Sequence, residues 1–209
     1  TRRQRQMCIR DRVRTLTVAI DGTNAGVVSG INVNSVADVV IRGLNIHSFS
    51  ENGIQVSNAT NVVIQCNHIG TDLAGGTADA NGKNGILIND SSTGVIIGTN
   101  GDGIDDDTEY NLISGNNATA GGSGIILTEA ASNNIVAGNR IGTDVTGMNA
   151  VANGGIGIQI QEGSTSNRIG TNSDGTSDDE ERNIISGNGN HGVSIFEEGS
   201  DGNTVAGNY

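Results

Sequence analysis

Ile-Gly-Thr-Asp at residues 69–72, followed by Gly-Ile-Leu-Ile at residues 85–88, returns 72 positions later in almost the same form. Residues 141–144 read Ile-Gly-Thr-Asp again, and residues 157–160 read Gly-Ile-Gln-Ile. A fixed interval between independent landmarks is typical of a repeat architecture. The same shift of 72 relates two further pairs: Gly-Thr-Asn at 98–100 and 170–172, and Ile-Ser-Gly-Asn at 113–116 and 185–188.

A shorter repeat lies inside this unit. Pieces of the form Gly-(Ile/Val)-x-(Ile/Val/Leu) are each followed by an asparagine-bounded aliphatic piece and then by a third one, such as Leu112-Ile113. Three short strands per turn, divided by turn residues, predict a solenoid of triangular cross-section built from stacked coils. The glycines that open these pieces are Gly53, Gly85, Gly124, Gly157 and Gly192.

The smallest coil gives the length of one turn. Val-Val-Ile at residues 39–41 recurs at residues 62–64, a spacing of 23 residues. Later coils are longer, so we expect them to carry insertions on particular faces, where solenoids often bind ligands. The expected insertions span residues 73–84 and 145–154 on one face, and residues 100–110 and 172–182 on another.

The spacing of the aliphatic residues predicts the interior. Pairs such as Ile86/Ile88 and Ile158/Ile160 lie two apart, so both members point to the same side of a strand. Stacked coil upon coil at about 4.8 Å, they would form aliphatic ladders. The asparagines at the strand ends would stack likewise, with their amides bonded along the axis.

Composition fits this picture. The chain has 33 glycines, no proline and few aromatic residues, so no strand loses a ladder hydrogen bond to proline. The formal net charge is −12, and the body beyond residue 12 carries −16, because the first twelve residues contribute five arginines and one aspartate. Such a body repels nucleic acid and anionic membranes. No stretch approaches the roughly 20 apolar residues of a membrane span.

The domain organisation follows from these patterns. Residues 1–12 lack strand alternation and resemble a translated adapter or a disordered segment, with a short basic arm as the alternative. We expect residues 13–209 to be a single solenoid fragment, truncated at both ends. With the first segment set aside, Cys66 is the only cysteine, and we expect it to be buried at the position that Gly138 holds in the next long unit.

The repeat resembles a known family. Asn-x-(Ile/Val)-x-Gly-Asn followed by Ile-Gly-Thr-Asp, a loop, and Gly-Ile-x-Ile is similar to the right-handed parallel β-helix repeats of large bacterial extracellular proteins in the pectin-lyase-like superfamily. The likeness covers roughly residues 15–209. It implies an all-β, right-handed parallel β-helix and a secreted or cell-surface location. It specifies activity weakly, because one fold hosts many functions.

Calcium is one candidate ligand. In residues 98–109, oxygen donors alternate around a glycine and end in an acid, as a twelve-residue calcium loop requires, and residues 170–181 repeat the pattern. Both copies have glycine where the first aspartate normally stands, so a solvated acidic turn is the alternative. The candidate ligands are Asn100, Asp102, Asp106 and Glu109 in the first copy, and Asn172, Asp174, Asp178 and Glu181 in the second.

Catalysis is a weaker candidate. Asp72 and Asp144 are carboxylates that could act as acid and base in a polysaccharide lyase or glycoside hydrolase. They occupy equivalent repeats about two coils apart, however, and this periodicity favours turn bonding over a unique active site. Arg140 and Arg168 could support such chemistry if they converged on one face, but lone arginines on an acidic solenoid usually pair with acids.

Other residue types suggest little chemistry. The three histidines, His47, His68 and His191, lack metal-ligand spacing, and we expect them on solvent-facing turns or strand edges. We expect no aromatic platform for sugars, although an asparagine-rich groove could bond to glycans. The sequence therefore favours a non-catalytic surface scaffold for adhesion or for matrix or polysaccharide contact, with Ca²⁺ as the candidate cofactor. The four rings, widely separated in sequence, are Phe49, Tyr110, Phe196 and Tyr209.

Overall fold

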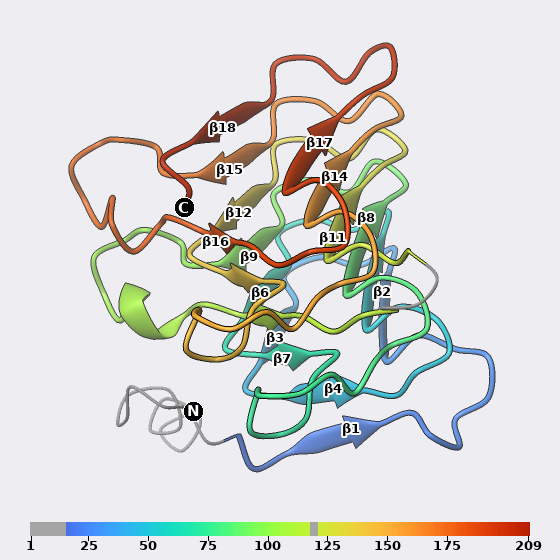
Figure 1. The fold of residues 1–209 in the computed structure, drawn as a ribbon. Coiled ribbons are helices and arrows are strands. Elements are labelled where there is room, and N and C mark those ends of the chain that lie inside the picture. The colour runs from blue at the N-terminus through green and yellow to red at the C-terminus, as the bar shows by residue number, and fades with distance from the viewer. Residues whose placement is uncertain (1–15, 118–120) are drawn as a thin grey trace.

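The computed structural model describes residues 16–117 and 121–209 (Figure 1). These residues form a right-handed parallel β-helix, with three parallel sheets of six strands each. The predicted fold class is therefore confirmed. The predictions made for residues 1–12 lie outside the described residues.

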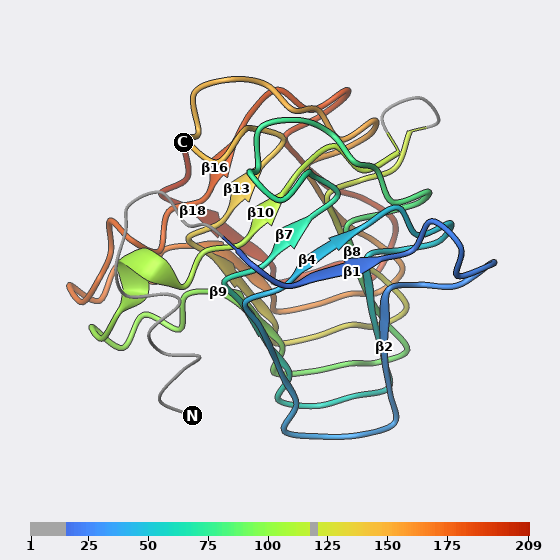
Figure 2. The same ribbon diagram turned by 90° about the horizontal axis from the view of Figure 1, so that it is seen from below.

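Each coil contributes one strand to each sheet, in the order sheet 1, sheet 2, sheet 3 (Figures 1 and 2). Sheet 1 consists of β1 (Ala19–Asp21), β4 (Asn45–His47), β7 (His68–Ile69), β10 (Leu112–Ile113), β13 (Arg140–Ile141) and β16 (Ile184–Ile185). Sheet 2 consists of β2 (Ile31–Asn34), β5 (Ile54–Ser57), β8 (Ile86–Asn89), β11 (Ile125–Leu127), β14 (Ile158–Ile160) and β17 (Val193–Ile195). Sheet 3 consists of β3 (Val40–Arg42), β6 (Val63–Gln65), β9 (Ile96–Gly98), β12 (Ile135–Ala137), β15 (Arg168–Gly170) and β18 (Thr204–Ala206).

The register explains the 72-residue interval. Ile113 of β10 pairs with Ile69 of β7 on one side and with Ile141 of β13 on the other. Landmarks 72 residues apart are therefore separated by two coils, as predicted. Figure 2 shows the six strands of sheet 1 lying side by side along the stack.

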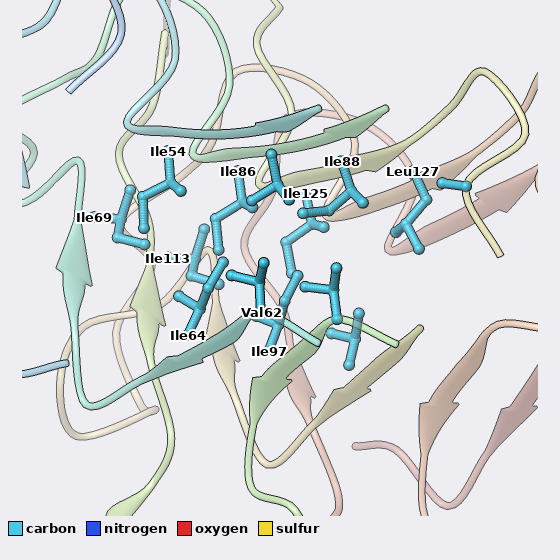
Figure 3. Close-up of a cluster of buried hydrophobic side chains, with 14 of the residues drawn as sticks. Ile54, Val62, Ile64, Ile69, Ile86, Ile88, Ile97, Ile113, Ile125 and Leu127 are labelled. Atoms are coloured by element: carbon cyan, nitrogen blue, oxygen red, sulfur yellow. The ribbon is translucent and has the colours of Figure 1, made fainter. Parts of the chain in front are cut away.

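The core is a set of aliphatic ladders. Ile86 and Ile88 of β8 pair with Ile125 and Leu127 of β11, and all four side chains are fully buried. Figure 3 shows these side chains directed toward others from sheets 1 and 3, such as Ile113 and Ile97. Each buried aliphatic side chain contributes roughly 1.5–3 kcal/mol, so the ladders supply most of the stabilisation.

Asparagine ladders run along the three corners between the sheets. In the corner between sheets 3 and 1, Nδ2 of each asparagine donates to Oδ1 of the asparagine one coil further on. A backbone carbonyl accepts the second Nδ2 hydrogen, as Ile64 O does from Asn111. The predicted axial bonding is thus confirmed. The three ladders are Asn67–Asn111–Asn139–Asn183–Asn208, Asn81–Asn116–Asn153–Asn188 and Asn134–Asn167–Asn203.

The insertions project from every second coil. Between sheets 1 and 2, loops follow β7 and β13; between sheets 3 and 1, loops follow β9 and β15. One short 3-10 helix, η1 (Asp106–Thr108), lies in the loop after β9. Among residues 16–117 and 121–209, no helix has the length and apolar character needed to cross a membrane.

Candidate functional site

The two acidic loops, residues 100–109 and 172–181, project from the same corner of the solenoid. They lie at the left of Figure 1, the first carrying η1 and the second drawn in orange above it. The connection between β12 and β13, which comes between them in the stack, is only residues 138–139. The loops are therefore two coils apart, or about 9.6 Å, with a tight turn between them.

One aspartate in each loop folds the loop onto itself. Thr99 Oγ1 and the Gly103 N–H donate to the Asp106 carboxylate, and Ser177 Oγ of the second loop donates to it as well. Burial raises the pKa of Asp106, but these hydrogen bonds outweigh burial and lower it. In the second loop, Asp178 accepts equivalent bonds from Thr171 Oγ1 at 3.0 Å and from the Gly175 N–H at 3.1 Å.

The glutamate that ends each loop turns inward and meets an arginine. Glu109 Oε1 lies 3.2 Å from Arg42 Nη2, and Glu181 Oε1 lies 3.0 Å from Arg168 Nη1. Burial raises the pKa of Glu109, although the Asn100 N–H and Arg42 offset part of the effect. Arg168 therefore forms the ion pair expected of it.

The remaining calcium candidates bond to each other. Asn100 Nδ2 donates to Asp102 Oδ2 at 2.9 Å, and Asn172 Nδ2 donates to Asp174 Oδ2 at 2.8 Å. Over the described ranges, no three His, Cys, Asp or Glu side chains gather as a metal site would require. Calcium binding by these loops stays a prediction, and cation titration tests it.

Asp72 and Asp144 brace the loops that follow β7 and β13. Asp72 accepts hydrogen bonds from the Gly76 and Thr77 N–H groups and from Thr77 Oγ1. Asp144 accepts bonds from Thr146 Oγ1 at 2.6 Å and from Asn149 Nδ2 at 2.7 Å. Burial raises the pKa of each carboxyl, whereas the hydrogen bonds lower it. The hydrogen bonds outweigh burial, so the pKa of both Asp72 and Asp144 lies below its ordinary value. A lowered pKa suits an ionised brace better than a general acid.

A recess of about 210 Å³ opens between the two acidic loops. Tyr110 and Tyr209 both line it, although 99 residues separate them in sequence. The Arg140 guanidinium lies 4.2 Å from the Tyr110 ring centroid, and that of Arg182 lies 5.3 Å from the centroid of Tyr209. Coil stacking thus brings both rings to the corner between sheets 3 and 1, where each lies beneath a guanidinium, although the two are far apart in sequence.

The structure places the other candidate residues separately. Arg140 and Arg168 belong to different sheets, β13 of sheet 1 and β15 of sheet 3.

His68 is fully buried, which corrects its expected place at the surface. The loop after β7 covers it: a side chain at Gly75 would lie 3.1 Å from His68 Cε1. Cys66 is buried as predicted, in the turn that Gly138 occupies two coils later.

Comparisons with known proteins add no relative. No family model, no curated protein sequence and no solved structure matches this chain.

Proposed function

We propose that this chain is a non-catalytic scaffold of a secreted or cell-surface protein, which holds its loops in fixed positions for contact with glycans or matrix. The resemblance to pectin-lyase-like repeats of bacterial extracellular proteins supports the location. The rigid stack supports the scaffold role, because loops on a solenoid inherit the positions of the coils that carry them.

The observation that carries this proposal is that Asp72 and Asp144 each accept hydrogen bonds within their own loops. These two candidate catalytic carboxylates have equivalent places two coils apart, and each is bonded to its own loop. A general acid needs a raised pKa and an open position beside its substrate. Both carboxyls have lowered pKa values instead and are bonded within their own loops, which argues against their use as general acids.

A polysaccharide panel tests the proposal with two readouts. The protein is incubated with neutral and acidic polysaccharides, and both retention on the polysaccharide and release of reducing or unsaturated sugars are measured. The scaffold account predicts retention without release. Release of sugars that is abolished by Asp72→Asn or Asp144→Asn would contradict it and favour a lyase or glycosidase.

A further inference from the structure

We infer that the recess between the acidic loops binds one uncharged hexose unit of a glycan chain. This inference rests on the proposed function and deepens it by assigning a site and a ligand class. The recess lies at the corner between sheets 3 and 1, and both of its walls are insertions absent from the intervening coil.

The recess exists because the coil between the two loops turns so tightly. Gly138 lines it, with φ of +74°, and a side chain there would lie 2.6 Å from the Glu180 carbonyl oxygen. Only glycine fits this turn without displacing the second loop. At about 210 Å³, the space is below the roughly 300–1,000 Å³ of sites for drug-sized ligands, so it suits a single sugar ring.

Two arginines supply hydrogen-bond donors that are already held in place. Arg140 packs over Tyr110 and donates from Nη1 to the Val145 carbonyl at 2.6 Å. Arg182 packs over Tyr209 and lies 3.2 Å from Asp179. A guanidinium on a ring face keeps its N–H edges for bonds in its own plane, and little side-chain entropy is lost when a ligand binds there.

Carboxylates that the fold does not use supply the acceptors. Asp107 and Glu180 are exposed at the recess, and within the described parts of the chain neither side chain has a hydrogen bond or an ion pair. Asp106 beside them is buried and bonded within the loops. Bracing therefore accounts for Asp106 and leaves Asp107 and Glu180 without a structural task.

This combination matches the hydroxyl groups of a sugar. Each hydroxyl both donates and accepts, so guanidinium edges beside carboxylates can bind neighbouring hydroxyls in pairs. Four acidic residues and two arginines line the recess, so its net negative charge repels uronates and sulfated sugars. The ligand class is therefore a glycan of uncharged hexose units.

Titration followed by NMR tests this site. The probes are cellohexaose, mannohexaose and maltohexaose, with hexagalacturonate as the acidic counterpart. We expect a neutral hexasaccharide to bind at least about tenfold more tightly than hexagalacturonate. Arg182→Lys and the double variant Asp107→Asn/Glu180→Gln should each weaken binding at least about tenfold, since the first removes the planar guanidinium held on the Tyr209 ring and the second removes the charge of both acceptors.

The matched control is the double variant Asp90→Asn/Asp201→Asn. It removes the same two charges from exposed residues outside the recess, and its affinity should stay within twofold of the parent protein. Thermal melts of every variant check that it folds.

If a neutral glycan binds and the recess variants leave its affinity unchanged, the site is overturned while the proposed scaffold stands. Preference for hexagalacturonate, or no saccharide binding, would overturn the inference, whereas sugar release would contradict the proposed function instead.

Discussion

The side-chain amide of Asn111 donates to Oδ1 of Asn139 at 2.9 Å, although 28 residues separate the two along the chain. The backbone N–H of Asn111 donates to the same oxygen at 3.0 Å. Each asparagine thus accepts two hydrogen bonds from the coil before it, which makes the ladder directional. Buried polar groups at a solenoid corner are satisfied in this way without water.

Asn139→Ala should destabilise the protein by about 3 kcal/mol or more, because it leaves two donors of Asn111 and the Ile97 carbonyl without their partner. Urea denaturation followed by circular dichroism measures the change. Asn190→Ala, at an exposed position, is the control and should shift stability by less than about 0.5 kcal/mol. Equal midpoints for the two variants would refute the structural role of the ladder.

Gly98→Ala should be far more destabilising than Gly163→Ala, although both glycines have positive φ. Alanine at Gly163 meets nothing within 4 Å and pays only the backbone cost of about 1–2 kcal/mol. A Cβ at Gly98 would lie 1.8 Å from the Ala137 carbonyl oxygen of the next coil, so the coils must separate. Chemical denaturation compares the pair, and similar losses would argue against close stacking at β9.

Asp144→Asn should cost about 1–2 kcal/mol at neutral pH, because the amide cannot accept on both sides as the carboxylate does. The folded-state pKa of Asp144 is lowered, so its ionised form stabilises the protein above the ordinary value of 3.8. That contribution is lost as pH falls through the folded-state pKa. The gap between variant and parent should therefore narrow below pH 4 in denaturation curves, whereas Asp90→Asn should show little effect. A gap independent of pH would contradict the brace.

If the acidic loops are solvated turns, calcium should change the melting temperature little, because Asp106, Asp178 and the two loop glutamates already have partners within the protein. A calcium module predicts the opposite: a saturating rise with millimolar Ca²⁺ that Mg²⁺ at equal ionic strength does not reproduce. Differential scanning calorimetry distinguishes the two. A specific rise that Asp102→Asn abolishes would establish the first loop as a calcium site.

Much of the fold could be read from the sequence, because each coil repeats the same inward pair. Ile86/Ile88 and Ile158/Ile160 mark strands by spacing alone, and the 72-residue interval gives the stacking. The corner asparagines were predictable for the same reason. The core of a solenoid can be predicted from periodicity because every coil packs against its neighbours in the same way.

The recess could not be read in this way. Tyr110 and Tyr209 line the same recess only because of the number of coils between them, and their arginines come from two further coils. His68 shows the same limit. It stands on the outward face of β7, and the loop after β7 folds over it and buries it, which the strand pattern alone does not predict. Loop packing depends on contacts that have no period.

Engineered disulfides test the stacking itself. Thr93 pairs with Ser132 in the adjacent coil, and Ser132 pairs with Thr165 in the next. With Cys8 and Cys66 replaced by serine, Thr93→Cys/Ser132→Cys should cross-link, because neighbouring coils lie about 4.8 Å apart, within disulfide reach. Thr93→Cys/Thr165→Cys should not, since two coils span about 9.6 Å. Peptide mapping by mass spectrometry gives the result. A bond in the first variant alone is predicted, and a bond in the second alone, or in neither, would contradict the parallel β-helix.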